Sequence, residues 1–120
     1  MRRLGELEAA IMDVLWSASA PLTVREVLGA LDRDPEPAYT TVMTVLDNLH
    51  RKDNVTRERV GRAWAYRPAQ TREEFDAEAM AAVLESSTDR GATLLRFIGK
   101  ISPEELARLR ELMDAAEEPR

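Results

Sequence analysis

Residues 38–66 change from a helical to a strand period, and this change constrains the fold of the chain most. The first half places apolar side chains at the i, i+3, i+4 and i+7 positions of one helix face. These positions are Val42, Val45, Leu46 and Leu49. The opposite face carries Thr40, Thr44 and Asn48, followed by Arg51. The pattern predicts a helix that buries one face and exposes small polar side chains on the other.

The second half is typical of a β-hairpin. Residues 55–59 alternate in polarity, and Gly61 supplies a turn. Trp64 and Tyr66 then alternate before Pro68 ends the strand, and we expect both rings to pack the hairpin onto the helices. A helix with a small polar face followed by an arginine-edged hairpin is typical of the recognition helix and wing of a winged helix-turn-helix. The stretch therefore predicts a DNA-reading element.

The preceding residues supply the other helices of such a domain. Residues 4–17 have an amphipathic helical pattern, and Thr23 with Glu26 forms a capping box for a second helix. The breaker cluster DRDPEP at 32–37 ends that helix. This order predicts a winged-helix DNA-binding domain over residues 1–70.

Residues 71–120 are predicted to be helical, with capping boxes at 71–74 and 102–105 and a short apolar segment at 94–98. These short helices can either close a single-chain core or pair with a second copy of the chain. The second arrangement is favoured, because so few helices cannot bury their own apolar faces. The predicted dimer interface consists of Phe75, Leu94, Leu95, Ile98, Leu106, Leu109, Leu112 and Met113.

The fold class is thus mainly α with a small β-hairpin: a winged helix-turn-helix DNA-binding domain plus a C-terminal helical dimerisation segment. No apolar run approaches the ~20 residues that span a bilayer, so no membrane insertion is expected. Glu6 and Glu8 interrupt the apolar residues after the basic start, which argues against a signal peptide. The absence of cysteine excludes disulfides and favours a cytoplasmic location.

The net charge of −5 is unevenly distributed. Through Arg72 there are 11 Lys and Arg against 10 Asp and Glu, or +1, and the remaining residues hold 6 against 12, or −6. Within the first part, seven cations gather around the hairpin: Arg51, Lys52, Arg57, Arg59, Arg62, Arg67 and Arg72. The acid lies mostly in the C-terminal segment, and the overall acidity does not exclude DNA binding.

No catalytic chemistry is expected. His50, the only histidine, lacks an informatively spaced partner and is expected beside the end of the third helix. With no cysteine it cannot form a metal cluster. There is no phosphate-binding glycine loop or nucleophile elbow. We therefore predict a non-enzyme with no catalytic residue, metal or cofactor.

The threonine face and the hairpin arginines each have two interpretations. Thr40, Thr41 and Thr44 can form ordinary helix surface, but threonine is a mediocre helix former, and its hydroxyl and methyl suit phosphates, base edges and the thymine methyl. Arg59 and Arg62 flank Gly61 and can be solvated or can contact phosphates or the minor groove. DNA contact is favoured in both cases.

Five segments carry a family resemblance: LGELE at 4–8, IMDVLW at 11–16, PLTVREV at 21–27, YTTVMTVL at 39–46 and LHRK at 49–52. They resemble the BlaI/MecI/CopY family of bacterial repressors over nearly the whole chain. The resemblance implies a dimeric repressor that binds a palindromic operator with TACA/TGTA-like half-sites. Together with the patterns above, the candidate DNA-binding residues are Thr23, Tyr39, Thr40, Thr41, Met43, Thr44, Asn48, Arg51, Arg59 and Arg62.

The resemblance also bears on regulation. In β-lactam-responsive members a membrane sensor-protease signals cleavage in the dimerisation domain, and the matching peptide here is Arg96-Phe97, where family substrates have Asn before Phe. Copper-responsive members use a cysteine cluster that this chain lacks. Asp53 stands where the family often has Gly. The main alternative function is a winged-helix protein-protein interaction module without operator binding.

Overall fold

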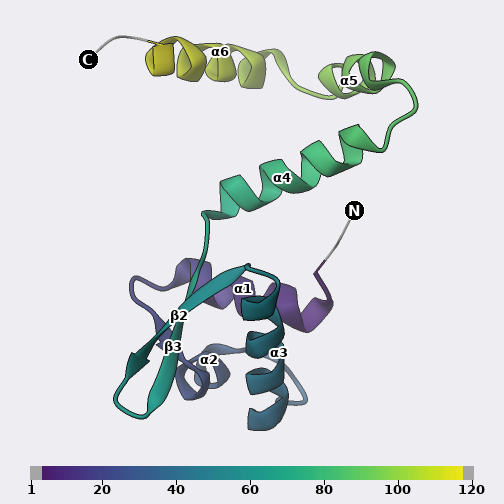
Figure 1. Cartoon of the computed structure of the whole chain (residues 1–120). Helices are drawn as coiled ribbons and strands as arrows, with labels where there is room; N and C mark the ends of the chain where they lie inside the picture. Colours follow the sequence, from purple (N-terminus) through teal and green to yellow (C-terminus); the bar gives the residue numbers. More distant parts are fainter. Residues whose placement is uncertain (1–3, 118–120) are drawn as a thin grey trace. The chain divides into compact units, whose positions relative to one another are not determined.

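Six helices and three strands make up the described residues, 4–117, of this computed structural model (Figure 1). The chain divides into two compact units, Met1–Ala79 and Met80–Arg120. The elements are α1 (Glu6–Ser17), β1 (Leu22–Thr23), α2 (Val24–Ala30), α3 (Tyr39–Arg51), β2 (Val55–Val60), β3 (Ala63–Pro68), α4 (Arg72–Glu85), α5 (Arg90–Ile98) and α6 (Pro103–Glu117). The predicted class, mainly helical with a small antiparallel sheet, is confirmed.

The core of the first unit lies where α1, α2 and α3 pack against the sheet. It is apolar and consists of Ile11, Met12, Leu15, Val24, Val27, Val42, Leu46, Leu49, Val55 and Tyr66. On α3 the predicted face is inward, with Val45 only partly buried. On α2 the Thr23 hydroxyl accepts from the Glu26 backbone N–H at 3.2 Å, which confirms the capping box. The burial of one face of α3 leaves its polar face outward.

The sheet has the strand order β1-β3-β2 and is antiparallel. The hairpin pairs Arg59 with Trp64 and Val60 with Ala63, and Gly61 adopts the positive φ of 62° that the tight turn requires. The two-residue strand β1, where Leu22 lies opposite Tyr66, was not predicted. Two residues are too few to show a strand period.

Only one of the two hairpin aromatics packs into the core. Tyr66 is 1% exposed, whereas Trp64 is 36% exposed, so the expectation that both rings pack onto the helices is wrong for Trp64. Trp64 lies nearer to the hairpin turn and outside the core cluster. The guanidinium carbons of Arg57 and Arg59 lie 4.3 and 4.8 Å from the centre of its ring.

A left-handed residue joins α3 to the hairpin. Asp53 has φ 63°, and its backbone N–H donates to the His50 carbonyl at 3.1 Å. The next N–H, of Asn54, donates to the Leu49 carbonyl at 2.9 Å. These bonds form a Schellman motif, in which glycine is the usual left-handed residue. The turn therefore forms with Asp in place of the family's frequent Gly.

The first unit extends beyond the hairpin into the start of α4. Trp16 is partly buried; its Nε1–H donates to the Gln70 carbonyl at 3.0 Å, and its ring meets Phe75 edge-on at 5.4 Å. The guanidinium of Arg72 lies over the same ring at 4.8 Å and bonds Asp13 at 2.7 Å. These contacts explain why this unit ends at Ala79, beyond residue 70. The dimerisation role of residues 71–120 stays a prediction.

The second unit consists of short, exposed helices. The α5 helix begins at Arg90, earlier than the apolar segment at 94–98, because the Asp89 carboxylate caps it by accepting from the Ala92 N–H at 3.0 Å. The capping box that starts α6 is confirmed. None of the described residues of α4, α5 and α6 is buried. Of the helices within residues 4–117, none combines the length and apolar character that a membrane span requires.

Candidate nucleic-acid interface

The outer face of α3 carries the predicted reading residues. Thr40, Thr41 and Thr44 are exposed, and Tyr39 and Met43 are also exposed on the side that faces the hairpin. The polar α3 face has no ion pair with another described element except through Asp47. The three threonine side chains are therefore accessible to a ligand.

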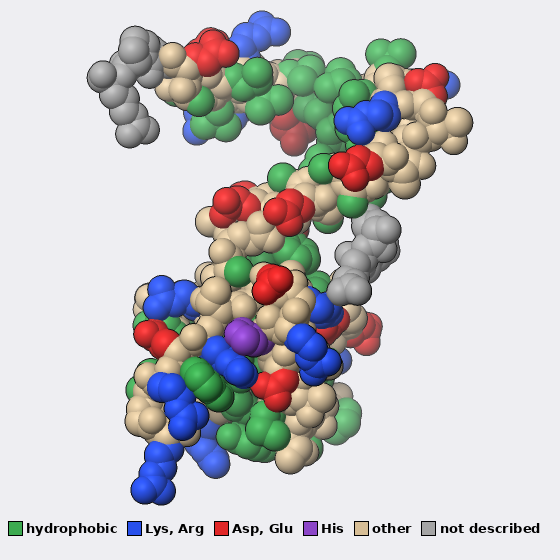
Figure 2. Space-filling view, viewed as in Figure 1, with side chains coloured by type: hydrophobic (Ala, Val, Ile, Leu, Met, Phe, Trp, Pro, Cys, Tyr) green, Lys and Arg blue, Asp and Glu red, His purple; other side chains and the backbone are tan. Residues whose placement is uncertain are grey.

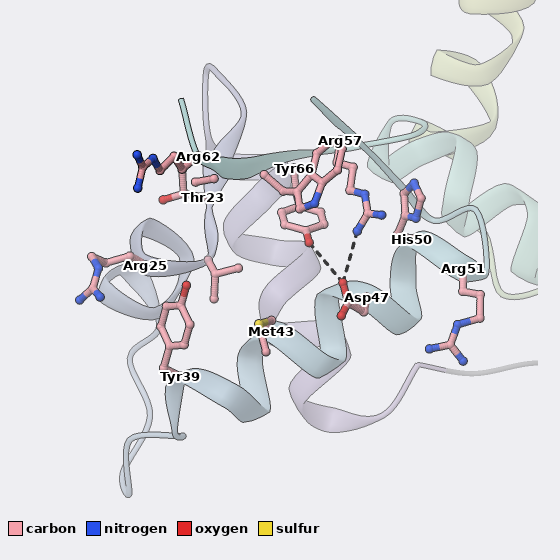
Figure 3. A pocket seen from close by; sticks show the side chains of 13 residues that line it. Thr23, Arg25, Tyr39, Met43, Asp47, His50, Arg51, Arg57, Arg62 and Tyr66 are labelled. Carbon is pink, nitrogen blue, oxygen red and sulfur yellow. Dashed lines mark hydrogen bonds and ion pairs between the residues drawn. The ribbon is translucent and has the colours of Figure 1, made fainter. Parts of the chain in front are cut away.

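An open groove of about 850 Å³ lies between this helix, the start of α2 and the hairpin (Figure 3). The groove combines aromatic rings with basic side chains: its lining residues are Thr23, Val24, Arg25, Tyr39, Met43, Asp47, His50, Arg51, Arg57, Arg62, Ala63, Trp64 and Tyr66. In this list Asp47 is the single carboxylate against four arginines. A negatively charged, partly apolar ligand matches this lining.

Two hairpin side chains hold the carboxylate of the groove. The Arg57 guanidinium lies 3.3 Å from Asp47 Oδ1, and the Tyr66 hydroxyl donates to the same oxygen at 3.4 Å (Figure 3). Burial raises the pKa of Tyr66 above its ordinary value of 10.0, so its hydroxyl is a neutral donor at physiological pH. Asp47 is thus compensated, and its repulsion of an anion in the groove is reduced.

The structure divides the seven cations around the hairpin into two sets. Four of them form ion pairs: Lys52 with Glu8, Arg57 with Asp47, Arg67 with Glu58, and Arg72 with Asp13. Arg51, Arg59 and Arg62 make no ion pair with any carboxylate of residues 4–117. These three are the arginines that the sequence assigned to DNA.

Other predicted residues have local partners. The Thr23 hydroxyl is engaged as the α2 cap but can still donate its proton. Arg51 donates to the Asn48 side-chain oxygen at 2.9 Å, so these two predicted residues form one polar pair at the end of α3. His50 lines the groove beside that end, as expected. The groove lining brings together some of the predicted residues, Thr23, Tyr39, Met43, Arg51 and Arg62. The others are not among its lining residues: Thr40, Thr41, Thr44, Asn48 and Arg59.

The groove residues that the sequence did not assign to DNA include Arg25, Arg57 and Trp64. Arg25 lies in the first turn of α2, and its guanidinium carbon is 5.5 Å from the centre of the Tyr39 ring. The available signal was its place two residues after the predicted cap Thr23. The partners of Arg57 and Trp64 depend on the hairpin register, which the sequence pattern does not give. Figure 2 shows blue Lys and Arg side chains gathered over the hairpin and around the purple histidine.

The predicted dimerisation residues mostly remain uncovered. Seven large apolar side chains of α5 and α6 are 42–73% exposed, with Leu95 the highest: Leu94, Leu95, Phe97, Ile98, Leu109, Leu112 and Met113. Leu106 is intermediate. Phe75 instead packs on Trp16 of its own chain, and its place in a dimer stays a prediction. The peptide Arg96-Phe97 lies inside α5.

Comparisons with known proteins show the family and the fold that this chain resembles. The sequence model described as "Penicillinase repressor" matches residues 4–115. The Transcriptional regulator BlaI of Mycobacterium tuberculosis is 41% identical over 116 residues, which are 94% of this chain and 84% of that protein. Among solved structures, MepR, a transcription regulator of the Staphylococcus aureus multidrug efflux pump MepA, aligns with a TM-score of 0.50 and 18% identity over 94% of this chain and 77% of its own. A MepR mutant from a multidrug resistant clinical isolate of the same organism gives 0.51 and 18% over 96% and 80%.

Proposed function

The chain belongs to the penicillinase repressor family of winged-helix transcriptional regulators, and from that premise we propose that it represses transcription as a dimer bound to a palindromic operator. Each copy contacts the bases of one half-site with the exposed face of α3. Its hairpin acts as the wing and contacts the sugar–phosphate backbone of the DNA. The operator half-sites are of the TACA/TGTA type that the family resemblance implies. The proposed contacts are Thr23, Tyr39, Thr40, Thr41, Met43, Thr44, Asn48, Arg51, Arg59 and Arg62.

One observation carries the proposal: of the seven cations around the hairpin, the three without a carboxylate partner among residues 4–117 lie at the end of α3 and at the tip of the hairpin. Arg51 ends α3, and Arg59 and Arg62 flank the turn at Gly61. A cation without a carboxylate partner can neutralise a phosphate and release its counterion. Threonines on the adjacent α3 face supply the hydroxyls and methyls that distinguish base edges.

The exposed apolar faces of α5 and α6 support dimerisation. A second copy is the occupant that suits a repressor of a two-fold operator, because a dimer aligns two recognition helices with two half-sites. Release follows loss of this dimer, and cleavage at Arg96-Phe97 is the proposed route, with a membrane sensor-protease as the partner. Because this peptide lies within α5, cleavage requires the end of that helix to unwind.

A pair of variants tests the division of roles. Arg62→Ala should weaken binding to operator and random duplex alike and reduce the slope of log K against log salt by about 0.9, the value for one phosphate contact. Thr44→Ala should instead lower the preference for operator over random duplex several-fold, about 1 kcal/mol, with little change in the slope. Fluorescence anisotropy with both duplexes at several salt concentrations measures both effects.

Arg110→Ala is the matched control for charge, since it removes one exposed cation from α6 rather than from the hairpin. It should leave the salt slope unchanged. Equal losses for operator and random duplex in both Arg62→Ala and Thr44→Ala would contradict the assignment of sequence reading to α3.

A further inference from the structure

We propose that the groove between α3 and the hairpin seats the sugar–phosphate backbone of one DNA strand, with Trp64 against deoxyribose and Arg25 and Arg57 at phosphates. The inference rests on the proposed function, because it concerns the same DNA complex. It adds three residues that neither the sequence nor the family resemblance assigned. It also gives the exposed indole of Trp64 a role.

The two walls of the groove have the same construction. On the α2–α3 wall, the Arg25 guanidinium carbon lies 5.5 Å from the centre of the Tyr39 ring. On the hairpin wall, the guanidinium carbons of Arg57 and Arg59 lie 4.3 and 4.8 Å from the centre of the Trp64 ring. A guanidinium that packs on an aromatic ring keeps N–H donors at its edge for phosphate oxygens.

Trp64 is one of the large apolar side chains that the first unit leaves exposed. The first unit buries Tyr66 almost completely, yet it leaves 36% of the larger Trp64 ring uncovered on the same strand. Exposed apolar surface rimmed by polar groups is a common mark of a binding surface. Arg57 and Arg59 pack against the ring, and Trp64 lines the groove.

The lining chemistry identifies the occupant as nucleic-acid backbone. Four arginines line the groove, and its single carboxylate, Asp47, is paired with Arg57. A DNA strand carries both anionic phosphates and sugar faces, and the groove offers both arginines and aromatic rings. An acidic protein segment would satisfy the arginines but offers no repeated apolar surface for Trp64. The groove also adjoins the α3 face proposed to read bases, so one strand can contact both.

The emission of Trp64 tests this inference directly in the full chain. The chain has two tryptophans, and Trp16 lies against the start of α4 rather than in the groove, so Trp64→Phe isolates the Trp16 signal. Saturating DNA duplex should reduce the iodide quenching of the wild-type chain. The quenching of Trp64→Phe itself should not change with duplex.

A second variant tests the phosphate contact. Arg25→Gln should lower the slope of log K against log salt by about 0.9, since one phosphate contact is lost. Arg33→Gln is the matched control: it removes an exposed cation from the loop between α2 and α3, outside the groove lining, and should leave the slope unchanged.

The outcomes separate this inference from the proposed function. If duplex binds with salt dependence but leaves the iodide quenching of Trp64 unchanged, the groove assignment is wrong and the repressor function stands. If polyglutamate protects Trp64 and bound duplex does not, the groove is a protein-docking site and the inference is overturned. If no duplex binds at all, the proposed function and this inference fall together.

Discussion

Asp53 occupies a left-handed backbone position that glycine would adopt with less strain. Its φ of 63° lies in the left-handed region, where a side chain is strained and glycine is not. Asp53→Gly should raise the free energy of unfolding by about 0.5 kcal/mol, the relief of strain less the added chain entropy of glycine. Asp53→Ala should lower it by about 1 kcal/mol, because alanine tolerates this φ less well than aspartate. Urea denaturation measures both, and stabilisation by alanine would contradict the left-handed geometry.

Tyr66 gives the stability a dependence on alkaline pH. Burial raises its pKa above 10.0, so the folded chain holds the phenolic proton more tightly than the unfolded chain does. This contribution is fully present below about pH 10 and is lost as pH rises through the folded pKa. Tyr66→Phe should flatten the decline in unfolding free energy above about pH 10.

Urea denaturation between about pH 8 and pH 11 tests that expectation. Tyr66→Phe also removes the hydroxyl that donates to Asp47, so it should cost about 1 kcal/mol at the lower pH. Tyr39→Phe alters an exposed ring and should retain the wild-type decline. If the unfolding free energy of Tyr66→Phe declined with pH as in the wild-type chain, the decline would come from groups other than Tyr66.

Residue types and local spacing predicted much of the candidate interface. The α3 face follows from a helical period, and Arg59 and Arg62 follow from their position around Gly61. The pairing of Arg57 with Asp47 did not follow, because it depends on how the hairpin docks on α3. For the same reason the pattern of alternation could not separate buried Tyr66 from exposed Trp64.

At the scale of elements, the sequence predicted features that depend on neighbouring residues better than features that depend on distant pairing. The capping boxes at Thr23, Thr71 and Ser102 predicted three helix starts, since each involves residues only three apart. Strand β1 was missed because it exists only through pairing with distant β3. The attachment of early α4 to α1 was also missed, because it joins Trp16 to Phe75 across the whole winged helix.

This attachment makes the start of α4 part of the first unit in energetic terms. A fragment of residues 1–79 should be more stable than one of residues 1–70 by about 1–2 kcal/mol, from the Trp16–Phe75 edge contact and the Arg72 guanidinium over Trp16. Within the longer fragment Phe75→Ala should lose about 1 kcal/mol, whereas Glu73→Ala, on an exposed side chain, should change little. Thermal and urea unfolding of the fragments measure these differences. Equal stability of the two fragments would show that the contacts with α4 contribute nothing.

At the scale of the whole molecule, the second unit exposes the apolar surface that a partner copy would cover. Leu95 is 73% exposed. It lies on α5, whose apolar residues are not buried within the chain. Leu95→Asp should weaken dimerisation at least about 100-fold, because burial of one leucine contributes about 1.5–3 kcal/mol and each dimer contains two. Analytical ultracentrifugation measures the change. Ala92→Asp adds the same charge to α5 at an alanine and should leave the dimer intact, whereas an unaltered dimer in Leu95→Asp would place the interface elsewhere.

The central claim is that the α3 face and the hairpin arginines bind DNA. Its most direct test is fluorescence anisotropy of the full chain with the duplex found upstream of its own gene and with a scrambled duplex, over a series of salt concentrations. The upstream duplex should bind more tightly, and log K should fall linearly with log salt for both. Absence of salt-sensitive binding to either duplex would contradict the claim and favour a winged helix that binds another protein.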